Sequence, residues 1–508
     1  MIALPARLTE VDQALVLPLT VLLPLLAGAL VLALRRNPNL RDGSSMLMGL
    51  VLALVVGALW SAPDAELSFT IWNWLPGLAF EFRMEPLGLL FATVSAVLWP
   101  LTTLYAVGYM RGNAEKHQTR FFLCFALAIA AAQWIAFSGN LVTLFVGYEF
   151  MTLATWPLVA HKGNEDAKRG ARVYLAVLLT TSIGLLLPAI VWTYLLTGTT
   201  QFSDGGILAG HGSPALFAVL YAMFLFGIGK AALMPFHRWL PAAMVAPTPV
   251  SALLHAVAVV KAGVFSVLKV TIYIFGLDNL SATGASQPMM WVAAFTLLAA
   301  GVIAVRQDNL KKRLAYSTVS QLSYIVLGAA LAQHYAVLEG ALHIATHAVG
   351  KITLFFCAGA IYTAHHLTRV SELDGLGQKM PYTFAAFTVA SISIIGLPPL
   401  AGSWDKLLLI EGSLEAGVPV MLGVLLAGAL LAIAYLMPVP MRAFFVRSDT
   451  HGADADNPSG NPRPRTEPVQ EAPLACVLPL CITALACIAM FFFEDALIEP
   501  LARRLGSP

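Results

Sequence analysis

Long apolar segments alternate with short polar connections along almost the whole chain. A membrane-spanning helix needs about 17–25 largely apolar residues, and we identify fourteen segments of this kind. They cover residues 14–34, 44–61, 85–109, 121–138, 140–160, 173–197, 214–236, 248–276, 289–305, 314–333, 337–364, 381–410, 417–445 and 474–493. The pattern predicts an all-α polytopic membrane protein with about fourteen transmembrane helices.

Positive charge is distributed unevenly among the connections. Loops after odd-numbered spans hold 21 of the 30 lysines and arginines, the other connections and the two ends hold four, and five lysines lie within spans. Because Lys and Arg are enriched in cytoplasmic loops, we expect the odd loops in the cytoplasm and both termini outside. The start, MIALPARLTE, lacks the regions of a cleavable signal. A multi-pass protein of the cell (inner) membrane is expected.

The composition excludes most soluble classes of protein. Of 508 residues, 58% are hydrophobic and 11% are charged, whereas soluble domains carry about 25% charged residues. No phosphate loop, dinucleotide fingerprint, haem ligand pair or iron–sulfur spacing is present, and the five cysteines fall in apolar spans. We therefore expect no cofactor, no metal and no nucleic acid partner. The one long polar stretch, 446–473, is predicted to be a disordered loop.

Two predicted spans are interrupted next to a lysine. Prolines follow Lys230 in GIGKAALMPFHRWLPAAMVAPTP, and Gly and Pro precede Lys406 in GLPPLAGSWDK. Proline breaks the hydrogen bonding of a helix, and paired interrupted helices indicate the ion site of a transporter. Spans four to eight and nine to thirteen then form two five-helix repeats. The predicted parts are 1–120 with three helices, 121–276 with repeat one, 289–445 with repeat two, 446–473 with the loop, and 474–508 with the last helix and tail.

Six charged side chains fall inside apolar spans. A charge in the bilayer core costs at least ~2.5–3.5 kcal/mol, so these residues are functional candidates. One of them, Lys269, is close to a helix end and is expected to extend its amine to the membrane surface. The set consists of Glu149, Lys230, Lys261, Lys269, Lys351 and Lys406.

Two histidines share a helical stripe with a lysine. His343, His347 and Lys351 are spaced four residues apart and lie on one helix face. Zinc binding is one interpretation, although no thiolate or carboxylate completes a tetrahedral set. A proton relay fits better, since imidazole both donates and accepts, and histidines that bond backbone carbonyls are the static alternative. His255, six residues before Lys261, lies on the roughly opposite face, where it is either a relay group or a polar core residue.

Glu149 and Lys230 form the favoured buried pair. At about 4 Å and an effective dielectric near 20, their attraction is roughly 4 kcal/mol. Moving the glutamate away would therefore tend to release the proton of the lysine and switch the site between loaded and empty. A static ion pair between two helices is the alternative.

Four stretches carry a family resemblance. The chain resembles the antiporter-like membrane subunits shared by Mrp-type multisubunit cation/proton antiporters and the NADH:quinone oxidoreductase of respiratory complex I. This resemblance implies fourteen helices with two inverted five-helix repeats, in which helices seven and twelve are broken. The stretches lie in order between about 140 and 410: GKAALMPFHRWLPAAMVAPTPVSALLHAVAVVKAG, DNLKKRLAYSTVSQLSY, HIATHAVGK and GLPPLAGSWDK.

The resemblance also implies residue roles. Glu149 matches the fifth-helix glutamate and Lys230 the seventh-helix lysine of the family's pair. Lys311 matches the lysine before LAYST, while Lys312 and Arg313 are interpreted as a cytoplasmic positive cluster. Matches to the central relay and its end are His255, His343, His347, Lys351 and Lys406, and Lys261 resembles the eighth-helix lysine of mainly Mrp-type members. The implied partners are other membrane subunits, protons and, in an antiporter, Na+, with no active site in this chain itself.

Some positions depart from the family pattern. Where certain complex I members have a sixth-helix aspartate, this chain has Thr180, Thr181 and Ser182. Lys406 argues against the M-type subunit of complex I, and no sequence for a long lateral helix follows the last span. Together with Lys261, these features favour a protein like the D-type component of Mrp antiporters. The alternatives are a proton-pumping subunit of a quinone oxidoreductase or membrane-bound hydrogenase, the membrane subunit of an inorganic-carbon uptake complex, and a structural scaffold.

Overall fold

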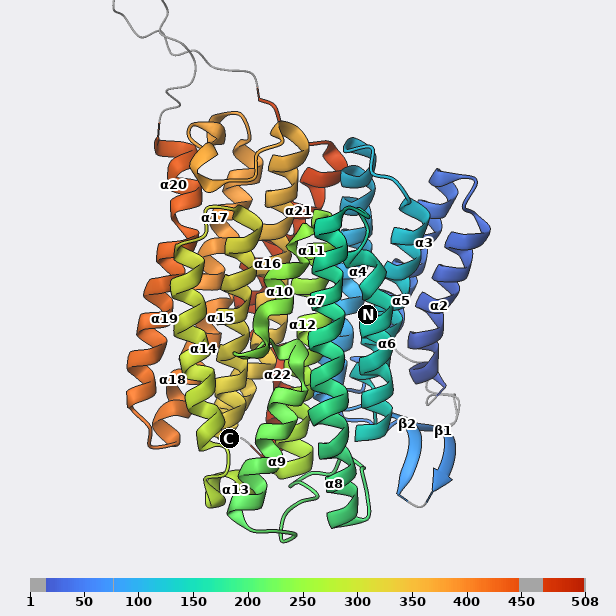
Figure 1. Cartoon of the computed structure of the whole chain (residues 1–508), viewed down its shortest axis with the longest axis vertical. Coiled ribbons are helices and arrows are strands. Elements are labelled where there is room, and N and C mark those ends of the chain that lie inside the picture. The colour runs from blue at the N-terminus through green and yellow to red at the C-terminus, as the bar shows by residue number, and fades with distance from the viewer. Residues whose placement is uncertain (1–14, 76, 447–468, 507–508) are drawn as a thin grey trace, which may run out of the picture.

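The protein is an elongated bundle of closely packed helices (Figure 1). The structure, a computed structural model, describes residues 15–75, 77–446 and 469–506. Within this part of the chain, 12 helical segments are long and apolar enough to cross a membrane. The two other predicted spans contain the shorter apolar helices α9 (Pro214–Gly227) and α17 (Pro381–Ile395). The chain is a multi-pass, helical membrane protein, and each of the fourteen predicted segments corresponds to helical structure.

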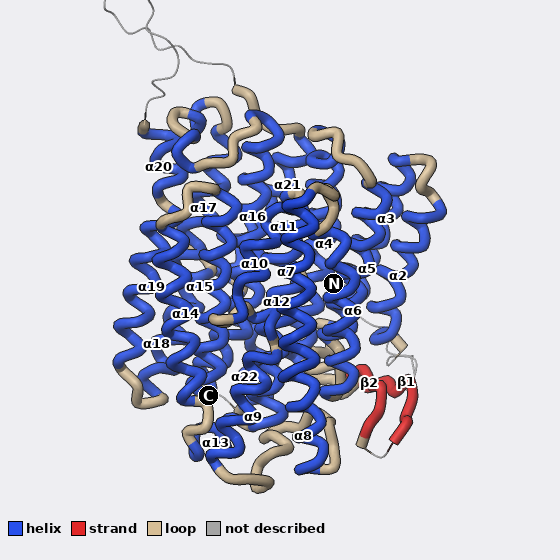
Figure 2. The backbone as a smooth tube through the Cα atoms, in the orientation of Figure 1, coloured by secondary structure: helices blue, strands red, loops and turns tan. Residues whose placement is uncertain are grey.

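A β-hairpin extends the N-terminal part of the bundle at one end (Figure 2). Its two strands are antiparallel, and Ser68 lies opposite Arg83. The hairpin is an addition to the predicted all-α architecture, although the aromatic and β-branched residues in SFTIWNWL favour a strand. This part consists of α2 (Val16–Ala33), α3 (Pro38–Leu59), β1 (Ser68–Leu75), β2 (Leu78–Arg83) and α4 (Pro86–Gly112).

The segment corresponding to the first predicted repeat contains several irregular helices. Three of its stretches are π-helical, a conformation that often occurs at functional sites: η1 (Ser182–Leu186), η5 (Leu253–Val257) and η6 (Thr271–Phe275). The remaining elements are α5 (Gln118–Ala136), α6 (Leu141–Val159), α7 (Glu165–Thr181), α8 (Leu187–Thr197), α9, η2 (Gly229–Ala231), η3 (Phe236–Arg238), α10 (Trp239–Ala242), η4 (Ala243–Val245), α11 (Thr248–Ala252), α12 (Val259–Val270) and α13 (Leu277–Thr283).

The second half contains the longest helix among the described residues, α16 (His334–His365). The predicted polar loop, 446–473, lies mostly outside the described residues. The tail after the last span is helical and forms α22 (Glu494–Leu505). The other elements are α14 (Gln287–Val305), α15 (Leu310–Leu331), η7 (Val370–Glu372), η8 (Leu376–Gln378), α17, α18 (Gly402–Glu415), α19 (Val420–Leu436), α20 (Pro438–Phe445), α21 (Leu474–Ala489) and η9 (Met490–Phe492).

Asparagine side chains define the starts of four helices. In each case the side-chain oxygen accepts a hydrogen bond from the backbone N–H three residues later, which satisfies one of the free donors of the first turn. These caps are Asn37 of α3, Asn140 of α6, Asn164 of α7 and Asn309 of α15. Lys311 and Lys312 are therefore placed in the first turn of α15.

Both predicted helix interruptions are confirmed. Helix α9 ends at Gly227, and Lys230 lies in the following short turn η2. The indole nitrogen of Trp239 donates to the Gly229 carbonyl at 2.9 Å, which satisfies backbone freed by the break. Helix α17 ends at Ile395, and Gly396 has a φ of +91°, a conformation that favours glycine. Helix α18 then begins at Gly402 and carries Lys406.

Candidate functional site

The buried polar side chains converge where the most enclosed helices meet. The span Thr248–Phe275, which includes α12, is completely buried within the bundle, as is α16 from Ala336 to Ile361, and most of α15 is buried too. An unpaired polar group there would be costly, so the contacts of each side chain indicate its role. We use the term central row for Lys261, His347, His343 and Asp405, whose side chains follow one another in space.

The first link of the central row joins α12 to α16. The amine of Lys261 lies 2.8 Å from Nδ1 of His347. The rings of His347 and His343 are 5.3 Å apart and inclined by 30°, so they are stacked. The predicted stripe of histidines on one helix face is present, and its first partner outside the stripe is Lys261.

The second link joins α16 to α18 through Asp405. Nδ1 of His343 lies 2.8 Å from Oδ2 of Asp405, and Thr346 donates to the same oxygen at 2.5 Å. Glu339, one turn before His343, places Oε1 4.0 Å from the same Nδ1. Both acids are fully buried. Sequence reasoning did not select them, although Asp405 adjoins Lys406 and Glu339 is four residues before His343.

Two other predicted lysines end near the central row without bonding to its histidines. Lys351 donates to Oγ of Ser317 on α15. The amine of Lys406 is buried, has no hydrogen-bond partner among the described residues and lies 3.1 Å from the ring centre of Tyr324. A cation over an aromatic face is attracted by the ring quadrupole. Lys406 is therefore held between α18 and α15.

His255 lies in the π-helical stretch η5, on the same span as Lys261. Its ring packs 4.8 Å from that of Phe355 on α16, whereas Lys261 reaches His347. The two side chains contact different residues, but both of these neighbours belong to α16, so an arrangement on opposite faces stays a prediction. Neither ring nitrogen of His255 has a hydrogen-bond partner among the described residues. Both buried nitrogens of His255 are thus free to exchange a proton with a water molecule.

Lys230 is enclosed by α6. Its amine donates to the Tyr148 carbonyl at 2.8 Å and to Oγ1 of Thr152 at 2.6 Å, and it lies 3.1 Å from the ring centre of Tyr148. A Cβ at Gly263 would collide with the backbone of Lys230 and Ala231. The glycine of the VVKAG sequence therefore lets the backbone of α12 approach that of η2 closely.

The expected direct contact between Glu149 and Lys230 is not formed in the part of the chain that the structure describes. Lys230 meets α6 at Tyr148 and Thr152, which are one turn apart and share a face, whereas Glu149 is rotated about 100° from Tyr148 around the helix. Both carboxylate oxygens of Glu149 are buried and lack a hydrogen-bond partner among the described residues. Any influence of Glu149 on Lys230 is therefore exerted without an ion pair between the two described side chains.

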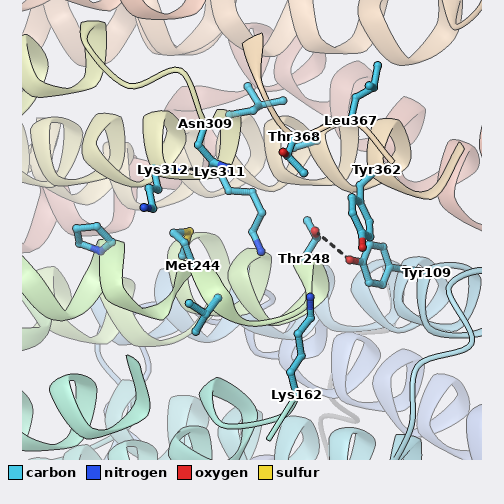
Figure 3. Close-up of a pocket in the computed structure, with 14 residues that line it drawn as sticks. Tyr109, Lys162, Met244, Thr248, Asn309, Lys311, Lys312, Tyr362, Leu367 and Thr368 are labelled. Atoms are coloured by element: carbon cyan, nitrogen blue, oxygen red, sulfur yellow. Dashed lines mark hydrogen bonds between the residues drawn. The ribbon is translucent and has the colours of Figure 1, made fainter. Parts of the chain in front are cut away.

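Lys311 borders a cavity of about 240 Å³ at the end of the bundle where α15 starts (Figure 3). The amines of Lys311 and Lys162 approach this space from opposite walls in Figure 3, and Lys312 lies beside them. Lys311 also donates to the Ala246 carbonyl at 2.5 Å, and Thr248 bonds to Tyr109 at 3.5 Å. Lys311 therefore links this cavity to the connection between η4 and α11.

One prediction about a basic residue is wrong. Lys269 does not extend to the membrane surface: its side chain is 0% exposed, 3.2 Å from Oε2 of Glu85, and it donates to the Ser138 carbonyl at 2.5 Å. The missing information was a partner distant in sequence. The cytoplasmic cluster of Lys312 and Arg313 stays a prediction. Arg313 is buried and donates to the carbonyls of Gln307 at 2.7 Å and Tyr435 at 3.2 Å.

Known proteins match the chain over most of its length. The family described as NADH:quinone oxidoreductase/Mrp antiporter, transmembrane, matches residues 138–432. NADH-quinone oxidoreductase subunit N of Desulforudis audaxviator is 31% identical over 436 residues, which cover 84% of this chain and 85% of that protein.

Two solved structures have a similar fold. A chain of the Mrp complex from Dietzia sp. superposes with a TM-score of 0.81 and 25% identity, covering 97% of this chain and 52% of that one. A chain of an archaeal membrane-bound sulfane sulfur reductase superposes with a TM-score of 0.83 over 98% of both chains, and at 21% identity it shows the fold alone. The chain belongs to the NADH:quinone oxidoreductase/Mrp antiporter transmembrane family.

Proposed function

We propose that this chain is a proton-translocating, antiporter-like subunit of a multisubunit membrane complex. The contact between Lys261 and His347 carries the proposal, because it places an ammonium against an imidazole in a completely buried part of the bundle. Burying ionisable groups in such surroundings costs free energy, and within membrane proteins these groups mark ion pathways and proton relays. A static scaffold would have no need of them.

The proposed path runs across the middle of the bundle. A proton enters near Lys230, where the charge of Glu149 governs how firmly the amine holds it. It passes through Lys261 or His255, with Lys311 and its cavity as a further connection to the surface, and continues along His347, His343 and Lys351. Lys406 is the terminal group, from which the proton leaves on the opposite side. Bound water bridges the gaps between these side chains.

Partner subunits supply the coupling. Movement at an interface changes the separation of Glu149 and Lys230, and the change alters proton occupancy in the path. In an Mrp-type monovalent cation/proton antiporter, the main assignment, this couples proton flow to Na+ movement. Lys261 and Lys406 favour that assignment and a D-type position within the antiporter. A membrane subunit of an NADH:quinone oxidoreductase is the second candidate, which the identity to subunit N favours.

The same proposal includes the location and orientation of the chain. The excess of Lys and Arg in the odd loops supports a cell (inner) membrane protein with both termini outside. In Figure 1 the α2–α3 connection and α20 lie at one end of the bundle, whereas the hairpin and α13 lie at the other. The two five-helix repeats at 121–276 and 289–445 complete the proposed organisation.

The test uses the intact complex, isolated through a tag on this chain. Mass spectrometry of the co-purified subunits distinguishes an antiporter from a redox complex. After reconstitution into liposomes with a pH-sensitive dye, we expect proton movement driven by a Na+ gradient or by electron transfer. Lys230→Ala abolishes it and leaves assembly intact. The matched control is Lys168→Ala, since Lys168 is an exposed lysine paired with Glu165. Normal transport by Lys230→Ala contradicts the proposal.

A further inference from the structure

We propose that Asp405 is a positioning residue of the relay, which holds His343 in one tautomer and one orientation. This inference rests on the proposed function, because it assigns a task within the same proton path. Asp405 thereby completes a line of polar side chains from α12 through α16 to α18, in which two hydrogen bonds flank the stacked rings of His347 and His343. Neither the family assignment nor the residues selected from the sequence include it.

The first argument is the geometry around one carboxylate oxygen. Oδ2 of Asp405 accepts from His343 at 2.8 Å and from Thr346 at 2.5 Å. The two donors are three residues apart and project from the same face of α16. Asp405 itself lies in the first turn of α18, where the partial positive charge of a helix N-terminus stabilises a carboxylate. The aspartate is therefore locked relative to both helices.

The second argument is the hydrogen that each histidine carries. An ionised carboxylate only accepts, so Nδ1 of His343 bears the hydrogen and Nε2 is left as the basic nitrogen. Nε2 is buried and has no partner among the described residues. At His347 the situation is reversed: Nδ1 faces the donor Lys261, so Nδ1 accepts and Nε2 carries the hydrogen. Two stacked rings of opposite tautomer present complementary nitrogens to a bridging water.

These tautomers define a balanced sequence of proton transfers. An N–H bond of Lys261 breaks as one forms at Nδ1 of His347, giving an imidazolium. The hydrogen on Nε2 of His347 then leaves through water and forms a bond to Nε2 of His343. The resulting imidazolium of His343 donates to Asp405, which stabilises its charge. The proton is therefore bound more stably at His343, beside the carboxylate of Asp405, than at His347, beside the amine of Lys261.

The surrounding charges support this assignment. His343 faces Asp405 of α18, Glu339 on its own helix and, through the stacked ring of His347, Lys261 of α12. Tyr324 of α15 is 6.2 Å away ring to ring, and Lys406 adjoins Asp405 in sequence. Two buried carboxylates thus stand beside two buried ammonium groups. Neutralising Asp405 leaves an excess positive charge and weakens proton binding at His343.

The experiment compares Asp405→Asn, Asp405→Glu and Ser403→Ala in the reconstituted complex. Ser403 is the matched control, since it lies in the same turn and, within the described part of the chain, its hydroxyl donates only to the Leu400 carbonyl. We expect Asp405→Asn to slow proton transport about tenfold or more and to move the half-maximal rate to lower pH. Asp405→Glu restores much of the rate, and Ser403→Ala matches the wild type. Wild-type rate and pH profile in Asp405→Asn overturn the inference.

A second variant decides the matter if Asp405→Asn does not assemble. Thr346→Val removes one donor from Oδ2 and leaves the carboxylate fully available to His343, so the half-maximal rate should move to higher pH. An unchanged pH profile in Thr346→Val overturns the inference. The proposed function is tested separately: if wild type and Lys230→Ala transport equally, that function fails. If only Lys230→Ala is inactive and the Asp405 variant is normal, the inference alone fails.

Discussion

The amine of Lys261 lies 2.8 Å from Nδ1 of His347, although the two residues are 86 positions apart in the chain. This contact joins the segment of the first predicted repeat to that of the second. A proton that crosses it moves from one half of the bundle to the other in a single step. Within the proposed path, this contact is therefore the direct link between the two predicted repeats.

Removing the imidazole at this point should interrupt transport. We expect His347→Ala to reduce proton transport by about 100-fold, within the range that a lost proton-transfer group produces. The measurement is dye-detected proton movement in proteoliposomes. The matched control is His334→Ala, because His334 begins the same helix and is only partly buried. Equal rates in both variants would remove His347 from the path.

Glu149 should act through its charge and not through a hydrogen bond. Its carboxylate oxygens have no partner among the described residues, so Glu149→Gln preserves the shape and removes only the charge. We expect a transport rate at least about tenfold lower, a change that corresponds to ~1.4 kcal/mol, because a neutral amide no longer attracts the amine of Lys230. Glu165→Gln, at an exposed glutamate, should behave as wild type. Full activity of Glu149→Gln would assign the switch to another group.

The Glu85–Lys269 ion pair should contribute to stability. Both side chains are buried, and removing one partner of such a pair costs about 3–5 kcal/mol because the other charge remains buried. Glu85→Ala should therefore lower the thermal midpoint of the purified complex strongly. The double variant Glu85→Leu/Lys269→Met should recover much of the loss. A midpoint for the double variant below that of the single one would contradict this account.

His161, in the connection between α6 and α7, should make stability depend on pH. Its burial, together with the nearby Arg120 cation, lowers its pKa from 6.5 to about 4. The unfolded chain therefore binds an extra proton between these values, so stability falls as the pH drops from about 6.5 to 4. His161→Gln should show a smaller decrease in thermal midpoint across this range. Parallel curves for variant and wild type would exclude His161 as the cause.

Much of the architecture could be predicted from the sequence, because the bilayer imposes length and polarity on every span. The breaks near Lys230 and Lys406 could also be predicted, since Pro and Gly act locally on the backbone. The hairpin and the π-helical stretch around His255 are different. They depend on tertiary packing, and no local pattern in LLHAV distinguishes a π-helix from an α-helix.

The candidate site shows the same division. The stripe of His343 and His347 follows from helical spacing alone. Asp405 could not be singled out, because nothing local indicates that its carboxylate turns toward α16. The environment of Lys230 could not be predicted from local sequence either. The rotation of α6 about its axis decides whether Lys230 contacts Glu149 or instead Tyr148 and Thr152.

The 32 residues of α16 extend for roughly 48 Å at 1.5 Å per residue, well beyond a hydrocarbon layer of about 30 Å. Because the chain buries this helix from Ala336 to Ile361, no lipid and no neighbouring protein can touch His343 or His347 directly. Outer helices such as α2 and α19, in which most residues are not buried, are the ones that an associated protein would contact. An associated protein must then act on the proton path indirectly, through a shift of the outer helices that is passed on to the helices packed against them. Such a shift would change the distances between the buried side chains of the path.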